Sequence, residues 1–329
     1  MKALVYTGPE ALMVTDCPDP VAGAGEVMIR VDSVGICGSD MHAFLGHDER
    51  RPAPLILGHE AAGVIMGGAR DGERVTINPL VTCGSCKPCT TGRENLCASR
   101  QIISMPPREG AFAQLVAMPE RNLVTVPDHV TLEQASLAEP IACGWHTVRL
   151  SLDVLREEPR EDLTALVIGG GPIGVGAALS LKAQGVPQVQ VIEPNPIRAD
   201  YLTTRGFDVI APDDLAAGHM VDLIIDGVGY PATRATASAH ARPGGVIGHI
   251  GLGASEGGLD IRRMTLQEIT FIGTYTYTAQ DFRDTCAAMF TGALGPLDWT
   301  ETRHLAEGQQ AFADIRGGSV PAPKIILKP

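Results

Sequence analysis

The stretch TALVIGGGPIGVGAALSLKAQG, residues 164–185, decides the fold of this chain. Its first residues, TALVIGG, form a continuous apolar run, which is typical of a strand buried on both faces. Residues 172–185 carry apolar side chains at helical spacing and end in glycine. The glycines between these segments match G-x-G-x-x-G, so backbone N–H groups and a helix N-terminus can approach a pyrophosphate. The candidate cofactor-binding residues of this loop are Gly169, Gly171, Pro172, Ile173 and Gly174.

The sequence on either side of this loop predicts two domains. Three further apolar runs, at 189–193, 222–229 and 244–252, alternate with helical segments and indicate a parallel, doubly wound sheet. The first 140 residues instead contain short strands broken by Gly and Pro. A chain of 329 residues is also long for a single core. We therefore expect a β-rich domain formed by residues 1–140 and 275–329, and a dinucleotide-binding Rossmann domain formed by residues 141–274.

An acidic residue follows the glycine loop at the spacing that a ribose contact requires. Glu193 ends the next strand, nineteen residues after Gly174. Its carboxylate can accept hydrogen bonds from the adenosine ribose and would repel a 2′-phosphate, which favours NAD over NADP. The alternative is a charge at the surface end of a strand. Arg198 lies nearby and either flanks the adenosine or attracts a 2′-phosphate.

Composition excludes several classes of function. No apolar run is long enough to span a membrane, and the N-terminal MKALVYTGPE does not have the pattern of a secretion signal. The net charge of −12 and the 14 aromatic residues disfavour nucleic-acid binding. We therefore expect a cytoplasmic protein, in which thiols stay reduced and disulfides are rare.

Half of the eight cysteines lie in VTCGSCKPCTTGRENLCASR, residues 81–100. Three are separated by two residues each, and the fourth follows after seven more, with Gly, Ser and Pro between them to form turns. Four thiolates can close a tetrahedron around one ion, which is the signature of a structural zinc. The alternative is four unconnected, oxidation-prone thiols in a loop. The predicted ligands are Cys83, Cys86, Cys89 and Cys97.

Two further motifs carry a family resemblance. GICGSDMH spans residues 35–42 and LGHEAAG spans residues 57–63. With the four-cysteine loop and the glycine loop, they make the chain similar, along essentially its whole length, to the zinc-dependent medium-chain alcohol dehydrogenases. Within that family it resembles the sorbitol, threonine and sugar-acid dehydrogenases. The resemblance implies a GroES-like catalytic domain joined to a Rossmann coenzyme domain.

The resemblance also implies a second, catalytic zinc. Cys37 and His59 would bind it, although their spacing alone would be a coincidence. Glu60 would be a ligand or an exchanging neighbour, which requires a turn that Gly58 permits. Glu139 lies in the EP pair of the sorbitol-type enzymes and would bind the ion directly or through water; the alternative is a solvated helix end before a proline.

The resemblance assigns three more residues. Ser39 and His42 match a hydroxyl-to-imidazole relay that removes the proton of the alcohol, and a histidine pKa suits this task. The alternative for His42 is a surface imidazole. Lys324 matches a basic residue that contacts the cofactor pyrophosphate. Cys143 would lie near the nicotinamide and serve in packing rather than as a nucleophile.

These patterns predict a two-zinc, NAD-dependent oxidoreductase that oxidises a secondary alcohol of a polyol, sugar or sugar acid, and that forms a homodimer or homotetramer. The alternatives are a dehydrogenase of simple or amino alcohols, and a catalytically silent NAD-binding protein. Sorbitol-type enzymes have an aromatic residue after the relay histidine, whereas this chain has Ala43 followed by Phe44. Arg50 and Arg51 either pair with a substrate carboxylate or form a solvated basic pair.

Overall fold

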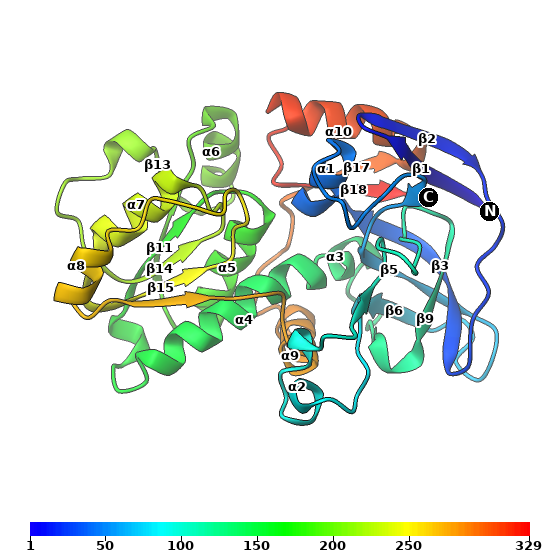
Figure 1. The fold of residues 1–329 in the computed structure, drawn as a ribbon, viewed down its shortest axis with the longest axis horizontal. Helices are drawn as coiled ribbons and strands as arrows, with labels where there is room; N and C mark the ends of the chain where they lie inside the picture. The colour runs from blue at the N-terminus through cyan, green and yellow to red at the C-terminus, as the bar shows by residue number, and fades with distance from the viewer.

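The computed structural model describes residues 1–329 and contains two lobes joined by a long helix, α4 (Ala138–Val154) (Figure 1). Both chain termini lie in the β-rich lobe. Each lobe has its own main hydrophobic cluster, with 33 and 32 buried residues, so neither lobe is an appendage of the other. None of the helices combines the length and the apolar character needed to cross a membrane.

The β-rich lobe is built on a seven-stranded sheet with the order β10-β6-β5-β3-β18-β17, to which β9 is added on β3. A three-stranded sheet, β2-β1-β4, and the pair β7-β8 complete it. The strands are β1 (Lys2–Gly8), β2 (Ala11–Asp16), β3 (Glu26–Gly35), β4 (Leu55–Ile56), β5 (Glu60–Met66), β6 (Arg74–Ile77), β7 (Leu80–Val81), β8 (Gln101–Ile102), β9 (Leu115–Pro119), β10 (Leu123–Thr125), β17 (Thr300–His304) and β18 (Lys324–Lys328). The helices of this lobe are α1 (Gly38–Phe44), α2 (Lys87–Thr90), α3 (Leu132–Ser136) and α10 (Gly308–Gly317).

The second lobe is a six-stranded, wholly parallel sheet with the order β13-β12-β11-β14-β15-β16. This is the doubly wound order of a Rossmann fold, in which the order reverses next to the first strand. The strands are β11 (Thr164–Ile168), β12 (Gln188–Ile192), β13 (Asp208–Ile210), β14 (Val221–Asp226), β15 (Ala241–His249) and β16 (Thr270–Gly273). The helices are α5 (Pro172–Ala183), α6 (Pro196–Thr203), α7 (Pro231–His240), α8 (Ile261–Leu266) and α9 (Ala279–Phe290).

The apolar run that opens the glycine loop is buried on both faces, as its sequence predicts. Ala165 and Val167 of β11 lie in the core beneath α4 and α5, whereas Leu166 and Ile168 lie in a separate core beneath α7 and α8. Helix α5 begins at Pro172, whose fixed φ suits the first helical turn. The chain leaves the helix through Gly185, at φ +101°.

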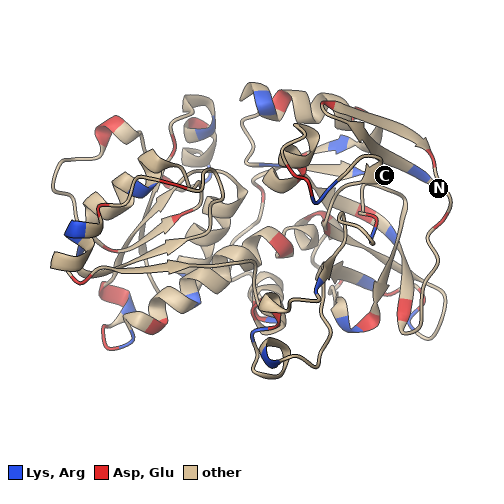
Figure 2. Cartoon of the chain, viewed as in Figure 1, with Lys and Arg blue, Asp and Glu red and all other residues tan.

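The expected domain boundaries fall close to structural transitions. The parallel sheet ends at Gly273, but α4 begins before residue 141 and α9 lies after residue 274 and packs on α4. The two helices thus form the seam between the lobes, and Figure 1 shows α9 beneath α4 with the cysteine-rich segment around α2 beside it. Acidic and basic residues are interspersed along the chain in both lobes (Figure 2).

Candidate functional site

The first metal-ligating cluster lies where β3 and β5 meet. Cys37 follows β3 and precedes α1, and His59 and Glu60 lie where β5 begins. Donor atoms of these three side chains lie within 4.8 Å of one another. The turn predicted at Gly58 is present, at φ +89°, and a Cβ there would come within 2.5 Å of the Phe112 ring. Only glycine fits, and this turn brings the imidazole and the carboxylate to the same cluster.

Buried polar groups orient this cluster. The carboxylate of Asp40 accepts hydrogen bonds from the backbone N–H of Cys37 (3.0 Å) and of Gly58 (3.2 Å), and it lies 3.5 Å from His59 Nδ1. Burial opposes its ionisation, but His59, Arg51 and the backbone N–H of Cys37 together outweigh burial and lower the pKa of Asp40. Ser104 Oγ lies 3.3 Å from the same imidazole nitrogen, which leaves Nε2 for an ion. Sequence reasoning missed Ser104, because no motif surrounds it.

Lys324 lies next to Glu60. Its side chain is fully buried, and Nζ donates to both carboxylate oxygens of Glu60, at 2.7 and 2.6 Å, and to the carbonyl of Ile36 at 2.8 Å. An ammonium group has three donors, so this lysine is saturated by protein acceptors. In this structure the ammonium group of Lys324 therefore binds Glu60 and Ile36, and the expected pyrophosphate contact stays a prediction. Lys324 instead compensates the charge of Glu60.

Glu139 lies in the first turn of α4, next to the cluster but outside the group of three donors. Only 7% of the residue is exposed, and the helix begins at Ala138 rather than ending before Pro140. The alternative of a solvated helix end is therefore wrong. Tyr277 donates a hydrogen bond to Glu139 Oε1 at 2.9 Å, and burial raises the pKa of Glu139 to about 7.

A cavity of about 340 Å³ joins these groups to the glycine loop. Ser39, His42 and Glu139 line it on one side, and Ile173 and Val228 line it on the other. The structure thus brings the predicted relay pair and the predicted metal ligands to one cleft between the lobes. Its volume falls within the range of small-molecule sites, which commonly lie between domains.

Cys143 also lines this cavity, but as a buried thiol. Burial raises the pKa of Cys143 well above its usual value. A thiol that stays protonated is a poor nucleophile. The structure therefore agrees with packing as the role of Cys143.

The glycine loop leaves room for a ligand. A Cβ at Gly174 would come within 1.8 Å of the Gly169 carbonyl oxygen, whereas a Cβ at Gly171 would meet nothing within 4 Å. The close approach at Gly174 lets the helix pack against the loop, and the open space at Gly171 lies where a pyrophosphate is expected.

Glu193 and Arg198 lie together beside this loop. The carboxylate of Glu193 accepts hydrogen bonds from the backbone N–H of Gly170 (2.9 Å) and of Asn195 (2.7 Å). Only 4% of Glu193 is exposed, so it is not a surface charge at a strand end. Arg198 Nη1 lies 3.7 Å from Glu193 Oε2, and the buried Nε of Arg198 has no protein acceptor.

The second metal-ligating cluster is the predicted four-cysteine set. The Sγ atoms of Cys86 and Cys89 are 3.4 Å apart, and those of Cys83 and Cys97 are 3.5 Å apart. Hydrogen bonds from backbone N–H groups lower the pKa of Cys83 to about 5, whereas the neighbouring thiols and burial raise the pKa of Cys86 to about 12, so the four sulfurs share their protons unequally when no ion is bound. Four convergent sulfurs fit a closed tetrahedral zinc, and the alternative of four unconnected thiols is wrong.

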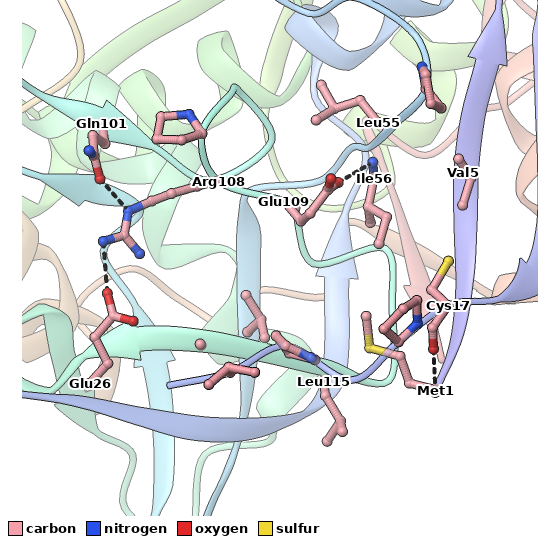
Figure 3. A pocket seen from close by; sticks show the side chains of 18 residues that line it. Met1, Val5, Cys17, Glu26, Leu55, Ile56, Gln101, Arg108, Glu109 and Leu115 are labelled. Carbon is pink, nitrogen blue, oxygen red and sulfur yellow. Dashed lines mark hydrogen bonds and ion pairs between the residues drawn. The ribbon is translucent and has the colours of Figure 1, made fainter. Parts of the chain in front are cut away.

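A different hollow, of about 620 Å³, lies on the outer side of the β-rich lobe (Figure 3). Val5, Leu55 and Leu115 line its apolar part, and Arg108 reaches across its edge to Glu26 and Gln101. It contains neither metal-ligating cluster nor any part of the glycine loop. The chemistry is therefore assigned to the cleft between the lobes.

Comparisons with known proteins agree with this geometry. Residues 23–128 match the alcohol dehydrogenase GroES-like domain, and residues 172–291 match the zinc-binding dehydrogenase domain. The sorbitol dehydrogenase of Bacillus subtilis is 32% identical over 84% of this chain and 82% of its own length. The L-galactonate-5-dehydrogenase of Escherichia coli K12 is 30% identical over 89% of this chain and 88% of its own.

Among solved structures, an alcohol dehydrogenase from Escherichia coli CFT073, complexed with NADH, has a TM-score of 0.88. It is 27% identical, and the match covers 100% of this chain and 99% of the other. The domain matches, the relatives and the two metal-ligating clusters agree with one another. The chain belongs to the zinc-dependent medium-chain alcohol dehydrogenase family.

Proposed function

We propose that this protein oxidises a secondary alcohol of a polyol, sugar or sugar acid, with one catalytic zinc, one structural zinc and NAD. The observation that carries the proposal is the cluster of Cys37, His59 and Glu60 at the wall of a cleft that Cys37, His59 and Glu139 line. A thiolate, an imidazole and carboxylates fit zinc, and three protein ligands leave a position for substrate. When bound, the zinc polarises the substrate hydroxyl and the NAD accepts the hydride.

The chain's own residues orient the substrate and move its proton. Ser39 lies two residues after Cys37, at the start of α1, and His42 is one helical turn further on, so both hydroxyl and imidazole line the cleft. The substrate proton passes to the Ser39 hydroxyl and then to the imidazole of His42, which can release it to solvent. Apolar side chains from both lobes, among them Ile102 and Ile250, exclude water from the rest of the cavity.

The substrate class rests on Glu139 and on the relatives. A carboxylate makes a zinc site richer in oxygen than a thiolate would, and such a site favours oxygen ligands. A polyol with adjacent hydroxyls supplies two of them. Sorbitol and L-galactonate, the substrates in the names of two relatives, both carry adjacent hydroxyls.

The test is a screen for NAD reduction over polyols, aldonates, amino alcohols and monohydric alcohols, made on protein whose zinc content has been measured. We expect about two zinc ions per chain and a much higher kcat/KM for a compound with adjacent hydroxyls than for butanol or benzyl alcohol. A monohydric alcohol as the best substrate would place the enzyme with the simple alcohol dehydrogenases. Threonine as the best substrate would favour the amino-alcohol alternative.

We also propose that the protein forms a homodimer or homotetramer. The strand β16 is an edge of the parallel sheet, and edge strands invite pairing with a second copy. Large apolar side chains are exposed in the same lobe, with Leu252 at 78% and Leu266 at 66%. Light scattering coupled to size-exclusion chromatography tests this proposal, and a monomer at micromolar concentration would contradict it.

A further inference from the structure

Two arginines and one carboxylate lie together on the substrate side of the cleft. Asp48 accepts hydrogen bonds from Arg50 Nε at 2.8 Å, from Arg50 Nη2 at 3.0 Å and from Arg51 Nη1 at 2.5 Å. Both arginines line the cavity that contains the metal-ligating cluster. The two guanidinium groups share the single carboxylate of Asp48 in their hydrogen bonds, so neither has all of its donors occupied by the protein.

Arg51 is not part of a solvated basic pair, since only 4% of it is exposed. Its Nε donates to the carbonyl of Ser104 at 3.0 Å, and the hydroxyl of Ser104 lies 3.3 Å from His59. This chain of contacts places Arg51 next to the metal-ligating cluster rather than next to the glycine loop. Its third nitrogen, Nη2, makes no hydrogen bond to the protein, so this donor remains free for a ligand in the cavity that Arg51 lines.

Arg50 offers a second free donor at the mouth of the same cavity. Its side chain is 62% exposed, and its Nη1 has no protein acceptor, although Nε and Nη2 both bond to Asp48. The bidentate contact with Asp48 fixes the guanidinium plane, so the free edge is already oriented. Arg100 lies close by, because its guanidinium covers the ring of Tyr275, another residue of the cavity wall.

We infer that Arg50 and Arg51 bind an anionic end group of the substrate while its secondary alcohol lies at the metal-ligating cluster. This inference deepens the proposed function and rests on it. An aldonate carboxylate and a polyol phosphate share the required chemistry, because each presents two or more charged oxygens to a guanidinium. A neutral polyol would offer no charged oxygen to the free donors of Arg50 and Arg51.

The test compares matched compounds that differ only at one end: sorbitol, gluconate and sorbitol 6-phosphate, then galactitol, galactonate and galactitol 1-phosphate. We expect one anionic compound of each set to exceed its neutral polyol in kcat/KM by about tenfold or more. In Arg50→Gln that ratio should fall by about ten- to a hundredfold, the range of a lost hydrogen bond to a charged group. Arg50→Lys should restore part of it, and Arg156→Gln, an exposed arginine outside the cleft, should leave it unchanged.

A second readout separates this inference from the proposed function. Titration calorimetry with gluconate and with sorbitol 6-phosphate, on enzyme saturated with NADH, measures anion binding without turnover. Weaker anion binding in Arg50→Gln, with the affinity for NADH unchanged, would support the inference and identify which anion is bound. If polyols are oxidised but the ratio and the anion affinity do not respond to Arg50→Gln, the inference is wrong and the proposed function stands. If no polyol or aldonate is oxidised, the proposed function fails, and equal anion affinity in the two proteins would then also overturn the inference.

Discussion

The two metal-ligating clusters differ in the origin of their ligands. The four cysteines come from fifteen consecutive residues, 83–97, in a loop whose side chains are mostly half-buried or exposed. Cys37 lies between β3 and α1, whereas His59 and Glu60 lie where β5 begins, and buried partners such as Asp40 and Lys324 surround all three. The loop can therefore bind an ion with little help from the rest of the fold. The cleft requires the whole β-rich lobe to be assembled first.

The two clusters also differ in charge. Four thiolates in the loop give a ligand set of −4 that meets no buried cation of the protein. In the cleft, the ammonium group of Lys324 lies 2.6 Å from Glu60 and offsets its charge, so the set of Cys37, His59 and Glu60 is less negative than four thiolates. A less negative set leaves the bound ion more electrophilic, which suits catalysis. The closed set suits a permanent ion with no free position.

The loop and the cleft are nevertheless connected through α9. Glu94 Oε1, in the loop, accepts a hydrogen bond from the backbone N–H of Ala279 at 2.5 Å, at the start of α9. Two residues later, Asp281 binds His146 and Arg149 of α4, the helix that begins beside Glu139. An ion bound in the loop would thus help to fix the seam that positions one wall of the cleft.

The largest effects are expected from variants that remove one ligand from a single metal-ligating cluster. Cys37→Ser should lower kcat/KM by about a thousandfold or more, because a Lewis acid contributes several kcal/mol to the barrier and each 1.4 kcal/mol is tenfold. It should leave the thermal midpoint nearly unchanged and remove one zinc. Cys89→Ser should instead lower the free energy of unfolding by about 4 kcal/mol or more. Zinc content, thermal unfolding and kcat/KM, measured on both variants, decide between these outcomes, and a similar loss of stability in both would abolish the distinction.

The next largest effect tests whether His42 transfers a proton in the cleft. His42→Gln should slow turnover by about ten- to a thousandfold near pH 7, the range of a general acid–base group, with zinc content unchanged. His129→Gln is the matched control, because that imidazole is exposed and bonds only to the Phe290 carbonyl, at 2.9 Å. Added imidazole should restore part of the lost rate in the first variant. An unchanged rate and pH–rate profile would make His42 a surface imidazole.

Sequence reasoning succeeded where ligands or loops are local. The spacing of Cys83, Cys86 and Cys89 predicts their convergence, and the glycine pattern at 169–174 predicts strand, loop and helix in order. Cys37 and His59 are predicted only through the family resemblance. They are far apart in the chain and meet only in the fold, where the turn at Gly58 directs His59 toward Cys37.

The sequence does not show side-chain contacts that depend on the order of strands in the sheet. The resemblance predicts Lys324 at the pyrophosphate, whereas in the structure its ammonium group binds Glu60 of β5, on the far side of β3 from β18. No local pattern shows the order β5-β3-β18, so the contact with Glu60 could not be read from spacing. The same applies to Ser104 and Tyr277, whose roles arise from tertiary contacts alone.

A smaller effect is expected on the choice between NAD and NADP. We expect this choice to depend on residues of the cleft and of the parallel sheet, and not on the cysteine loop. The native enzyme should prefer NAD over NADP, because the buried carboxylate of Glu193 would repel a 2′-phosphate. Glu193→Ala should reduce this preference by about tenfold, a change near 1.4 kcal/mol. Cys89→Ser should keep the native ratio of kcat/KM with NAD to kcat/KM with NADP. A ratio of two activities of the same sample does not depend on how much of the enzyme is folded. Equal kcat/KM for both cofactors in the native enzyme would reject this role.

The smallest expected effect concerns the contact that joins the two regions. Asp281 Oδ2 lies 2.7 Å from His146 Nδ1, and Asp281 also accepts from Arg149 Nε at 2.6 Å and from Thr278 Oγ1 at 2.6 Å. Burial alone would raise the pKa of Asp281, but these donors outweigh burial and hold it well below its usual range. The stabilisation is therefore complete above about pH 5 and is lost as the pH falls below the unfolded value of about 3.9.

Asp281→Asn should lower the free energy of unfolding at pH 7 by about 1 to 3 kcal/mol, the range of hydrogen bonds to charged groups. Asp281→Asn has no carboxylate to protonate at this position. The difference in the free energy of unfolding between the variant and the native protein should therefore become smaller when urea unfolding is repeated at pH 5, 4 and 3.5. Asp284→Asn is the control, since that side chain bonds only to Gln280, at 2.7 Å on the same helix, and its effect should stay small at every pH. Zinc content should remain at two ions in both variants, because α9 contacts the cysteine loop but supplies no zinc ligand. A difference that stays constant down to pH 3.5 would show that Asp281 stabilises the seam through packing and not through its charge.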